Sequence, residues 1–166
     1  IHLNGDVSTD IIMEDTDFGI AIKALRIRRN VEMFQWKESQ STIKQENQDG
    51  SQTSITRYSY HPVWSSTLIS SYNFDDRSYY NPDLFPVEGY IENSSEVTLG
   101  AFTISEDFVN KLDQWIRANI PETAYPNMAN QRLYPSGSYN LAYIGRGTLD
   151  RPEIGDLRIS FDIIPP

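Results

Sequence analysis

The sequence contains no cysteine and only two histidines. Without cysteine, the chain can form neither a disulfide nor a zinc–thiolate site, and it has no thiol nucleophile. Its stability is therefore independent of redox conditions, although this absence assigns the protein to no compartment. His2 and His61 each stand far from any nucleophile motif. His61 precedes Pro62 at the end of a strand-like run, so we interpret it as a surface residue and not as a general base.

The sequence also has little positive charge and no long hydrophobic run. It has 14 Lys and Arg residues against 23 Asp and Glu residues, which gives a formal net charge of −9. Nucleic acids bind basic surfaces, so this charge argues against them as partners. It argues equally against an anionic membrane surface as the main partner. No stretch of about 18 apolar residues occurs, so the sequence predicts no membrane-spanning helix.

What the sequence does contain is typical of a β-rich domain. Aromatic residues make up 12% of it, led by 10 Tyr and 7 Phe. Aromatic and β-branched side chains suit the half-buried surface of a sheet, so this composition favours strands. A length of 166 residues fits one domain with a substantial core. Because the chain begins at Ile1 without Met and ends directly after a strand-like run, we interpret residues 1–166 as a single soluble domain cut from a larger protein.

An alternating segment, a turn signal and a returning segment predict a long hairpin. Apolar and polar side chains alternate over residues 21–37, with an interruption at Arg29. Gln48-Asp49-Gly50 is a hairpin turn signal, and residues 53–64 have the Thr- and Tyr-rich composition of a strand. We therefore expect a hairpin whose polar tip lies at about residues 39–52.

Later parts of the sequence predict further strands. Residues 87–104 indicate one or two strands after a loop marked by Asn81-Pro82 and Phe85-Pro86. The C-terminal segment alternates most regularly. Its predicted inward side chains are Leu157, Ile159, Phe161 and Ile163.

One segment predicts a helix. Ser105 is a favourable N-cap, and Glu106 and Asp107 complement the positive end of a helix dipole. An apolar stripe at helical spacing follows, formed by Phe108, Leu112, Trp115 and Ile116. Favourable pairs four residues apart are Asp107–Lys111 and Asp113–Arg117. The predicted fold class is therefore α+β, mostly antiparallel β, with one main helix at about 105–119 packed on the sheet.

No motif in the sequence indicates catalysis, cofactor binding or a metal site. Ser136-Gly137-Ser138 lacks the strand and helix of a nucleophile elbow. Gly145-Arg146-Gly147 lacks the helix that follows a phosphate-binding loop, so we interpret it as a turn. Asp15-Thr16-Asp17 begins like a calcium loop, but Gly19 and Arg26 stand where further oxygen ligands are needed. We therefore expect no enzyme, no cofactor and no bound metal.

Two groups of residues are candidate interaction sites. Arg26, Arg28 and Arg29 could bind a carboxylate or phosphate through their guanidinium groups, or they could form structural ion pairs with Glu32 and other acidic neighbours. We favour the structural ion pairs because the chain is acidic. The second group is aromatic and comprises Tyr72, Phe74, Tyr79 and Tyr80, close to Phe85.

The aromatic group also has two interpretations. Clusters of Tyr can stack on sugars or anchor a partner protein, and they can equally pack a loop against the core. We favour loop packing. Asn93-Ser94-Ser95 fits the glycosylation sequon, which matters only in a eukaryotic luminal protein.

Several segments resemble those of the transmembrane protein 43 family, also called LUMA. The most specific are the Arg-rich segment 23–36, which ends in Gln35-Trp36, and the segment 152–161 with Gly155-Asp156-Leu157-Arg158. Further matching segments follow the family's order: Asp17-Phe18-Gly19, Thr56-Arg57-Tyr58-Ser59-Tyr60, Trp64, Asn73-Phe74, Asn81-Pro82 and Leu99-Gly100-Ala101-Phe102 with Ser105. The resemblance covers residues 3–163, and it departs from the family at 39–52 and 119–140.

The resemblance implies a place and an architecture. Family members are membrane proteins with a helix near the N-terminus, several helices near the C-terminus, and a large soluble region between them on the luminal or extracytoplasmic side. In animals, the family is associated with the endoplasmic reticulum and the inner nuclear membrane, where it self-associates and contacts lamins and emerin. For this chain, the expected location is thus the lumen in a eukaryote or the periplasm in a bacterium.

The expected function is that of a non-enzymatic domain of a membrane-anchored scaffold, which engages itself or other proteins. The membrane would be reached through segments outside this chain. The alternative is a ligand-binding module for a glycan or a lipid headgroup, which would use the tyrosine-rich segment or the arginines. A third hypothesis, an enzyme of an unrecognised type, would need a cleft with converging carboxylates.

Overall fold

The computed structural model describes residues 4–121, 131–134 and 140–166, and these form a mostly β structure. Its one helix among the described residues is α1 (Glu106–Val109), which has four residues. The strands are β1 (Val7–Ser8), β2 (Ile12–Asp15), β3 (Ile20–Lys23), β4 (Arg26–Glu46), β5 (Gln52–Ser65), β6 (Tyr90–Asn93), β7 (Thr98–Leu99), β8 (Phe102–Thr103), β9 (Ile116–Arg117), β10 (Gln131–Tyr134), β11 (Leu141–Ile144) and β12 (Leu157–Ile164).

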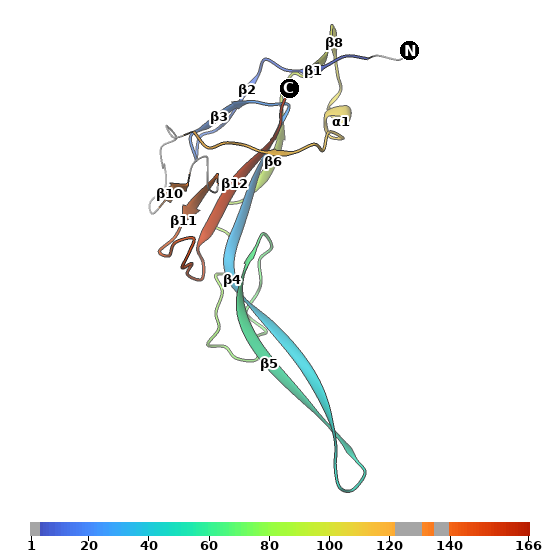
Figure 1. Cartoon of the computed structure of the whole chain (residues 1–166), viewed down its shortest axis with the longest axis vertical. Coiled ribbons are helices and arrows are strands. Elements are labelled where there is room, and N and C mark those ends of the chain that lie inside the picture. Colours follow the sequence, from blue (N-terminus) through green and yellow to red (C-terminus); the bar gives the residue numbers. More distant parts are fainter. Residues whose placement is uncertain (1–3, 122–130, 135–139) are drawn as a thin grey trace.

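The main sheet has seven strands and is antiparallel throughout. Its order is β10-β11-β12-β4-β5, with β6 paired to β4 and β9 paired to β12. Two small sheets lie beside it: β2 pairs with β3, and β1, β7 and β8 form a three-stranded sheet. Figure 1 shows the sheet strands crossing the upper half of an elongated molecule, with a twisted two-stranded hairpin extending below.

Strand β4 is the longest element and organises the sheet. Its 21 residues span about 70 Å at the usual rise of ~3.3 Å per residue. Along one edge, β12 pairs with β4 from Arg26 to Met33. Along the other edge, β6 pairs with Arg26–Arg29, and β5 pairs with β4 from Met33 to Glu46. The same strand therefore serves as the centre of the sheet and as one side of the hairpin.

The core lies on one face of the paired strands β4 and β12. All four side chains predicted to point inward from the last strand are buried, and so are Ile27, Val31 and Met33 of β4. The β2–β3 hairpin covers this face and places Phe18 at 5.8 Å from Phe161, edge to face. Each fully buried large apolar side chain stabilises the fold by roughly 1.5–3 kcal/mol. The predicted C-terminal strand is thus confirmed.

The predicted hairpin is also confirmed, with longer strands than expected. The turn spans residues 47–51, where Asp49 accepts a hydrogen bond from the Ser51 N–H at 2.9 Å. Gly50 has a φ of 82°, which suits a residue without a side chain. Residues 39–59, here called the arm, extend beyond the sheet and form the slender lower part of Figure 1.

The expected main helix is wrong, and so is the α+β fold class. Within residues 105–119, all of which the structure describes, only Glu106–Val109 are helical, and residues 116 and 117 instead form β9 at the edge of β12. The Ser105 hydroxyl makes no capping hydrogen bond. Phe108 and Ile116, which were expected on the buried stripe, are exposed. Neither predicted ion pair of the helix forms, since Arg117 binds Asp162.

Tertiary contacts explain why this helix stops early. The Arg26 guanidinium donates to the carbonyl oxygens of Asn110 and Leu112, at 3.1 and 2.6 Å. These carbonyls would be needed as acceptors in a continued helix. Trp115 lies over the same guanidinium, 5.0 Å from ring centroid to guanidinium carbon. A buried cation thus outweighs a helix propensity that is worth only tenths of a kcal/mol per residue.

The loop between β11 and β12 folds around one buried carboxylate, that of Asp156. This carboxylate accepts hydrogen bonds from the N–H groups of Arg146, Gly147 and Glu153, at 3.1, 3.0 and 2.9 Å. The hydroxyl of Tyr143 donates to it as well. A Cβ on Gly147 would lie only 2.6 Å from the carboxylate, so only glycine fits. The Gly145-Arg146-Gly147 segment therefore binds an anion that the chain itself provides.

We expect Asp156→Ala to destabilise the chain strongly. Removing the carboxylate leaves buried donors without an acceptor, which should lower the free energy of unfolding by about 3 kcal/mol or more. The measurement is urea-induced unfolding of both proteins. Asp49→Ala is the control, because Asp49 also accepts a backbone N–H but lies in the exposed turn; it should cost less than about 1 kcal/mol. Equal effects of the two substitutions would contradict this account.

Candidate functional site

The three candidate arginines lie at the start of β4, but on two different faces. Side chains alternate along a strand, so Arg26 and Arg28 point to the face opposite the core, whereas Arg29 shares the face of Ile27 and Val31. Arg29 is the residue that interrupts the alternation in the sequence. The arginines therefore do not form one cationic surface.

Arg29 lies in a partly buried ion cluster, in which Asp15 is buried and Asp17 is exposed. Its Nη1 is 2.9 Å from Asp15 Oδ2 and 3.0 Å from Asp17 Oδ2, and its Nε donates to the Glu88 carbonyl at 2.8 Å. Its guanidinium carbon is 4.7 Å from the Tyr90 ring centroid. Burial and a hydrogen bond to Asp15 raise the pKa of Tyr90. Both aspartates that resemble a calcium loop are thus ion partners of an arginine.

Arg28 belongs to a polar network centred on Asp162 of the neighbouring strand β12. Asp162 accepts hydrogen bonds from Arg28 at 2.6 Å, from Asn30 at 2.7 Å and from Arg117 at 3.0 Å. Partial burial raises the pKa of Asp162, but the hydrogen bonds of Arg28 and Asn30 and the charges of Arg117 and Arg28 outweigh it, so that its pKa lies below the ordinary value. The network engages Nε and Nη2 of Arg28 within the chain.

The outer face of the sheet continues this pattern of internal pairing. Arg158 of β12 binds Glu32, with 3.0 Å between Nη2 and Oε2, and its guanidinium lies 4.6 Å from the Trp64 ring centroid. Glu32 was the expected partner of the β4 arginines, but in the structure it forms its ion pair with Arg158. Each candidate arginine has a partner within the chain, and this geometry supports a structural role over the binding of an external anion.

A long loop, residues 66–89, is held against the base of the hairpin by two buried amide side chains. Gln35 accepts from the Ile69 N–H at 2.7 Å and donates to the Thr67 carbonyl at 3.0 Å. Asn81 accepts from the Trp36 N–H at 2.7 Å and donates to the Trp36 carbonyl at 2.8 Å. Asn81 thereby replaces a neighbouring strand at this edge of β4, directly beyond the end of β12.

The candidate aromatic residues divide into two pairs. Phe74 and Tyr79 pack the loop onto the hairpin: Tyr79 stacks on Tyr60 with 4.0 Å between ring centroids, and Phe74 is buried 5.6 Å from the same ring. Tyr72 and Tyr80 are 74% and 63% exposed. The structure therefore leaves only Tyr72 and Tyr80 of this group open to a partner.

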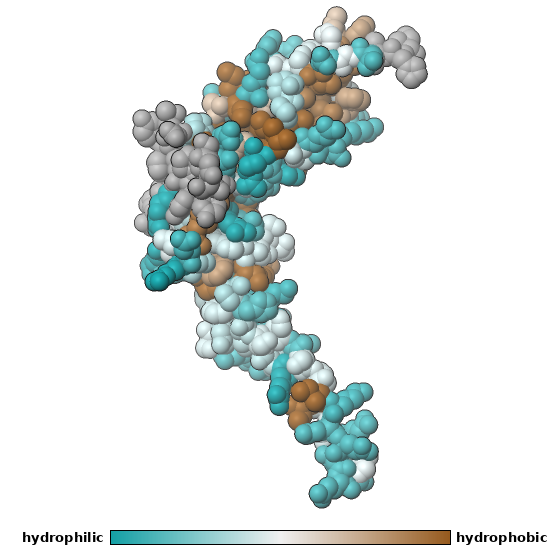
Figure 2. Space-filling view, viewed as in Figure 1, coloured by the Kyte–Doolittle hydropathy of each residue, from teal (hydrophilic) through white to brown (hydrophobic). Residues whose placement is uncertain are grey.

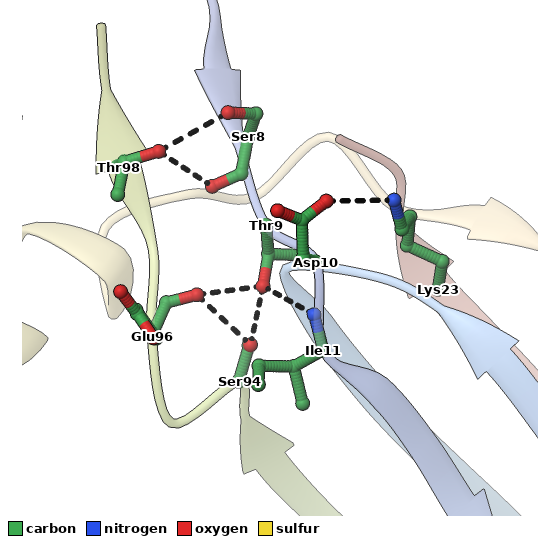
Figure 3. A network of polar contacts seen from close by, with 8 residues as sticks. All are labelled: Ser8, Thr9, Asp10, Ile11, Lys23, Ser94, Glu96 and Thr98. Atoms are coloured by element: carbon green, nitrogen blue, oxygen red, sulfur yellow. Dashed lines mark hydrogen bonds and ion pairs between the residues drawn. The ribbon is translucent and has the colours of Figure 1, made fainter. Parts of the chain in front are cut away.

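The N-terminal segment is joined to the body by a small polar cluster (Figure 3). The Thr9 hydroxyl donates to the Glu96 carbonyl at 2.6 Å and lies 2.9 Å from the Ser94 hydroxyl. Asp10 points away from this cluster and pairs with Lys23 at 3.1 Å. The carboxylate of Asp10 thus has a cationic partner, and the cluster serves to connect strands.

The side chain of Asn93, the potential glycosylation residue, is hydrogen-bonded at both its oxygen and its nitrogen. Its Oδ1 accepts from Arg26 Nε at 2.8 Å, and its Nδ2 donates to Asn110 Oδ1 at 2.7 Å. A glycan would attach at this nitrogen and separate Asn93 from Asn110. In the folded chain, the hydrogen-bonded amide therefore disfavours modification.

Within the residues that the structure describes, no three His, Cys, Asp or Glu side chains come close enough to hold a metal ion. No helix of the described part is both long and apolar enough to cross a bilayer.

An open groove of about 440 Å³ lies on the β5 and β6 side of β4. Strand β5 ends opposite Met33 and β6 begins opposite Arg29, so no strand of the described residues pairs with β4 between these positions on this side. The residues that define the groove here are Val31, Leu68, Asp83, Leu84, Phe85 and Glu88. The sequence interpretation missed this groove, because it arises from a break between strands that no local pattern shows.

Comparison with known proteins gives consistent matches. The sequence matches the family described as Transmembrane protein 43 over residues 33–166. Human Transmembrane protein 43 is 31% identical over 164 residues, which cover 97% of this chain and 39% of the human protein. The mouse protein is 29% identical over the same shares. The Drosophila melanogaster homolog is 25% identical, with 97% of this chain and 42% of the homolog covered.

The chain thus spans about two fifths of the length of these relatives. No solved structure matches it.

We expect Asp162→Asn to make the free energy of unfolding less dependent on pH under acidic conditions. Because the pKa of folded Asp162 lies below its ordinary value of 3.8, its contribution is complete above about pH 4 and is lost as the pH falls through the lowered pKa. The variant should be less stable at pH 7 and should lose less stability between pH 5 and pH 3. Urea unfolding at each pH measures this, and parallel profiles would refute it.

We also expect Gln35→Leu to loosen the loop at 66–89. The leucine fills a similar volume but leaves the Ile69 N–H and the Thr67 carbonyl without partners, at a cost of about 1–3 kcal/mol. Amide hydrogen exchange should accelerate in the loop before it does in β12. Gln40→Leu, at an exposed position of the arm, is the control and should change stability by about 0.5 kcal/mol or less. Unchanged exchange at Ile69 would contradict the role of Gln35.

Proposed function

Because the chain belongs to the transmembrane protein 43 family, we propose that it is a non-enzymatic, extracytoplasmic region of a membrane-anchored scaffold. In this role it associates with itself or with other proteins. The family name describes a membrane protein, and the relatives are more than twice as long as this chain. Parts of the protein outside this chain would then supply the membrane anchor.

The arm is the observation that carries a binding function. Residues 39–59 are exposed along nearly their whole length, and their one large apolar cross-strand pair is Ile43 opposite Ile55. An isolated two-stranded hairpin is marginally stable in water and presents unpaired backbone groups along both edges. A partner that covers the arm would satisfy these groups and stabilise it. An arm of this kind suits association better than it suits catalysis.

The placement of the ionisable groups supports a non-enzymatic role. The buried or half-buried carboxylates Asp15, Asp156 and Asp162 each bind donors of the chain itself. A general acid or base must reach a substrate proton from an open cleft. These carboxylates face guanidinium and backbone groups instead, so they stabilise the fold.

Binding of a glycan or a lipid headgroup is the second candidate function. It rests on the exposure of Tyr72 and Tyr80, since tyrosine rings can stack on sugars. Arg77 already lies over the Tyr72 ring, 5.2 Å from its centroid. Arg28 and Arg29, the other groups considered for this function, have partners within the chain. The arm therefore provides the stronger support for protein association.

We expect the chain to form dimers or larger assemblies as its concentration rises, and light scattering coupled to gel filtration measures this directly. The expected molar mass rises from the 19.1 kDa of one chain toward a multiple of it. Deletion of residues 41–57, with a two-residue turn in their place, should abolish the rise and leave the sheet folded. A constant monomer mass at every concentration would contradict self-association. A rise that the deletion does not change would exclude the arm as its cause.

A further inference from the structure

One face of the arm combines apolar and positive groups. Ile43 pairs with Ile55, and Ser41 pairs with Arg57 at the next position on the same face. Ile43 is 44% exposed and Arg57 is exposed. Figure 2 shows the apolar patch as an interruption of an otherwise hydrophilic arm. Lys44 and Glu46 point to the opposite face, so Arg57 is the one charged side chain that the strands of the arm present on the Ile43 face.

The groove on β4 has the complementary chemistry. Its apolar side chains include Leu84 and Leu68, which are 64% and 39% exposed. Its charged lining residues are Asp83 and Glu88, both acidic. In the described part of the chain, neither Asp83 nor Glu88 forms an ion pair, and neither does Arg57. A ligand with an apolar group beside a cation could contact the leucines and pair with the carboxylates of this groove.

We propose that the Ile43 face of the arm seats in the groove of a second copy of this chain. This inference rests on the proposed self-association and names its surfaces. Ile43 and Ile55 contact Leu68 and Leu84 of the second copy, and Arg57 lies between Asp83 and Glu88. The contact removes exposed apolar surface from both partners and pairs charges that form no ion pair among the described residues of one chain.

A two-fold arrangement allows this contact to form twice. Val31 of the groove and Ile43 of the arm lie on the same strand, twelve residues apart, which corresponds to about 40 Å. A two-fold axis midway between them, near Lys37, places each arm at the groove of the other copy. The interface is then closed and uses the same patch twice.

The overall charge distribution is compatible with this contact. The whole chain carries −9, so two copies repel one another at long range. The arm contains Lys44, Arg57, Glu46 and Asp49, and its net charge is therefore zero. A neutral arm can approach the acidic body of another copy with little repulsion.

Cysteine cross-linking tests the proposal. The chain has no cysteine of its own, so every disulfide must come from the introduced residues. Ile43→Cys and Leu84→Cys are made in separate chains, mixed, and oxidised with glutathione disulfide. Disulfide-linked pairs are expected in the mixture. Phe102→Cys replaces Leu84→Cys in the control mixture, because Phe102 has a similar exposure of 57% on β8. That mixture should yield few linked pairs.

Three other results would overturn the proposal. Linkage of Ile43→Cys chains to one another, in preference to Leu84→Cys, would show that arms pair with arms and would overturn the proposal. An assembly seen by light scattering without the Ile43–Leu84 linkage would overturn it too, while self-association would stand. A strict monomer in solution would overturn both this proposal and self-association.

Charge reversal supplies an independent test. Arg57→Glu should weaken association by about tenfold or more, because it places a third negative charge between Asp83 and Glu88. Lys44→Glu makes the same change in charge on the opposite face of the arm, and it should have a much smaller effect. Mixing Arg57→Glu chains with chains that carry Glu88→Lys should restore affinity. Equal weakening by both arm variants, or no rescue, would overturn the proposed seating.

Discussion

The antiparallel pairing of β4 with β12 is the constraint on which the rest of the structure depends. It joins the beginning of the long hairpin to the C-terminal strand, with Arg26 opposite Ile164 and Met33 opposite Leu157. The register also decides which side chains meet, because side chains alternate between the two faces. A shift by one residue would move Phe161 and Ile159 out of the core and bring Asp162 into it. The apolar face and the ion pairs on the other face therefore favour the same register.

The polar side chains of this fold act mainly as internal connectors. Asp162 links β4 to β12 and β9, Asp156 shapes the loop before β12, and Gln35 and Asn81 fix the loop that follows β5. Buried polar groups of this kind stabilise a fold only when all their partners are in place. The chain has no disulfide, and these saturated networks attach its long loops to the sheet in the absence of covalent links.

The sequence predicted those elements whose signal is local. The hairpin turn at residues 48–50 follows from turn chemistry, and strand β12 (Leu157–Ile164) follows from strict alternation. The helix at 105–119 was predicted from equally local signals and was wrong, because Arg26 captures its carbonyl groups from a distant strand. Arg29 was noticed as a break in alternation, yet nothing local identified Asp15 and Asp17 as its partners. Pairing across such distances depends on topology, which alternation along one strand does not specify.

The same distinction applies to the candidate sites. Arg26, Arg28 and Arg29 were singled out as a cluster, since they are neighbours in sequence, but alternation of the strand and distant acidic residues separate them. Tyr79 and Phe74 were grouped with Tyr72 and Tyr80 for the same reason, and packing against Tyr60 divides the group. The exposed apolar side chains and unpaired charges discussed above lie where strands end or extend past the sheet. The groove lies where β5 has ended and β6 has not yet begun along β4, and the arm extends past the other strands of the sheet beyond residue 38. Among the described residues, folding gives nearly every buried polar side chain a partner, so a partner molecule would add the most contacts at these two surfaces.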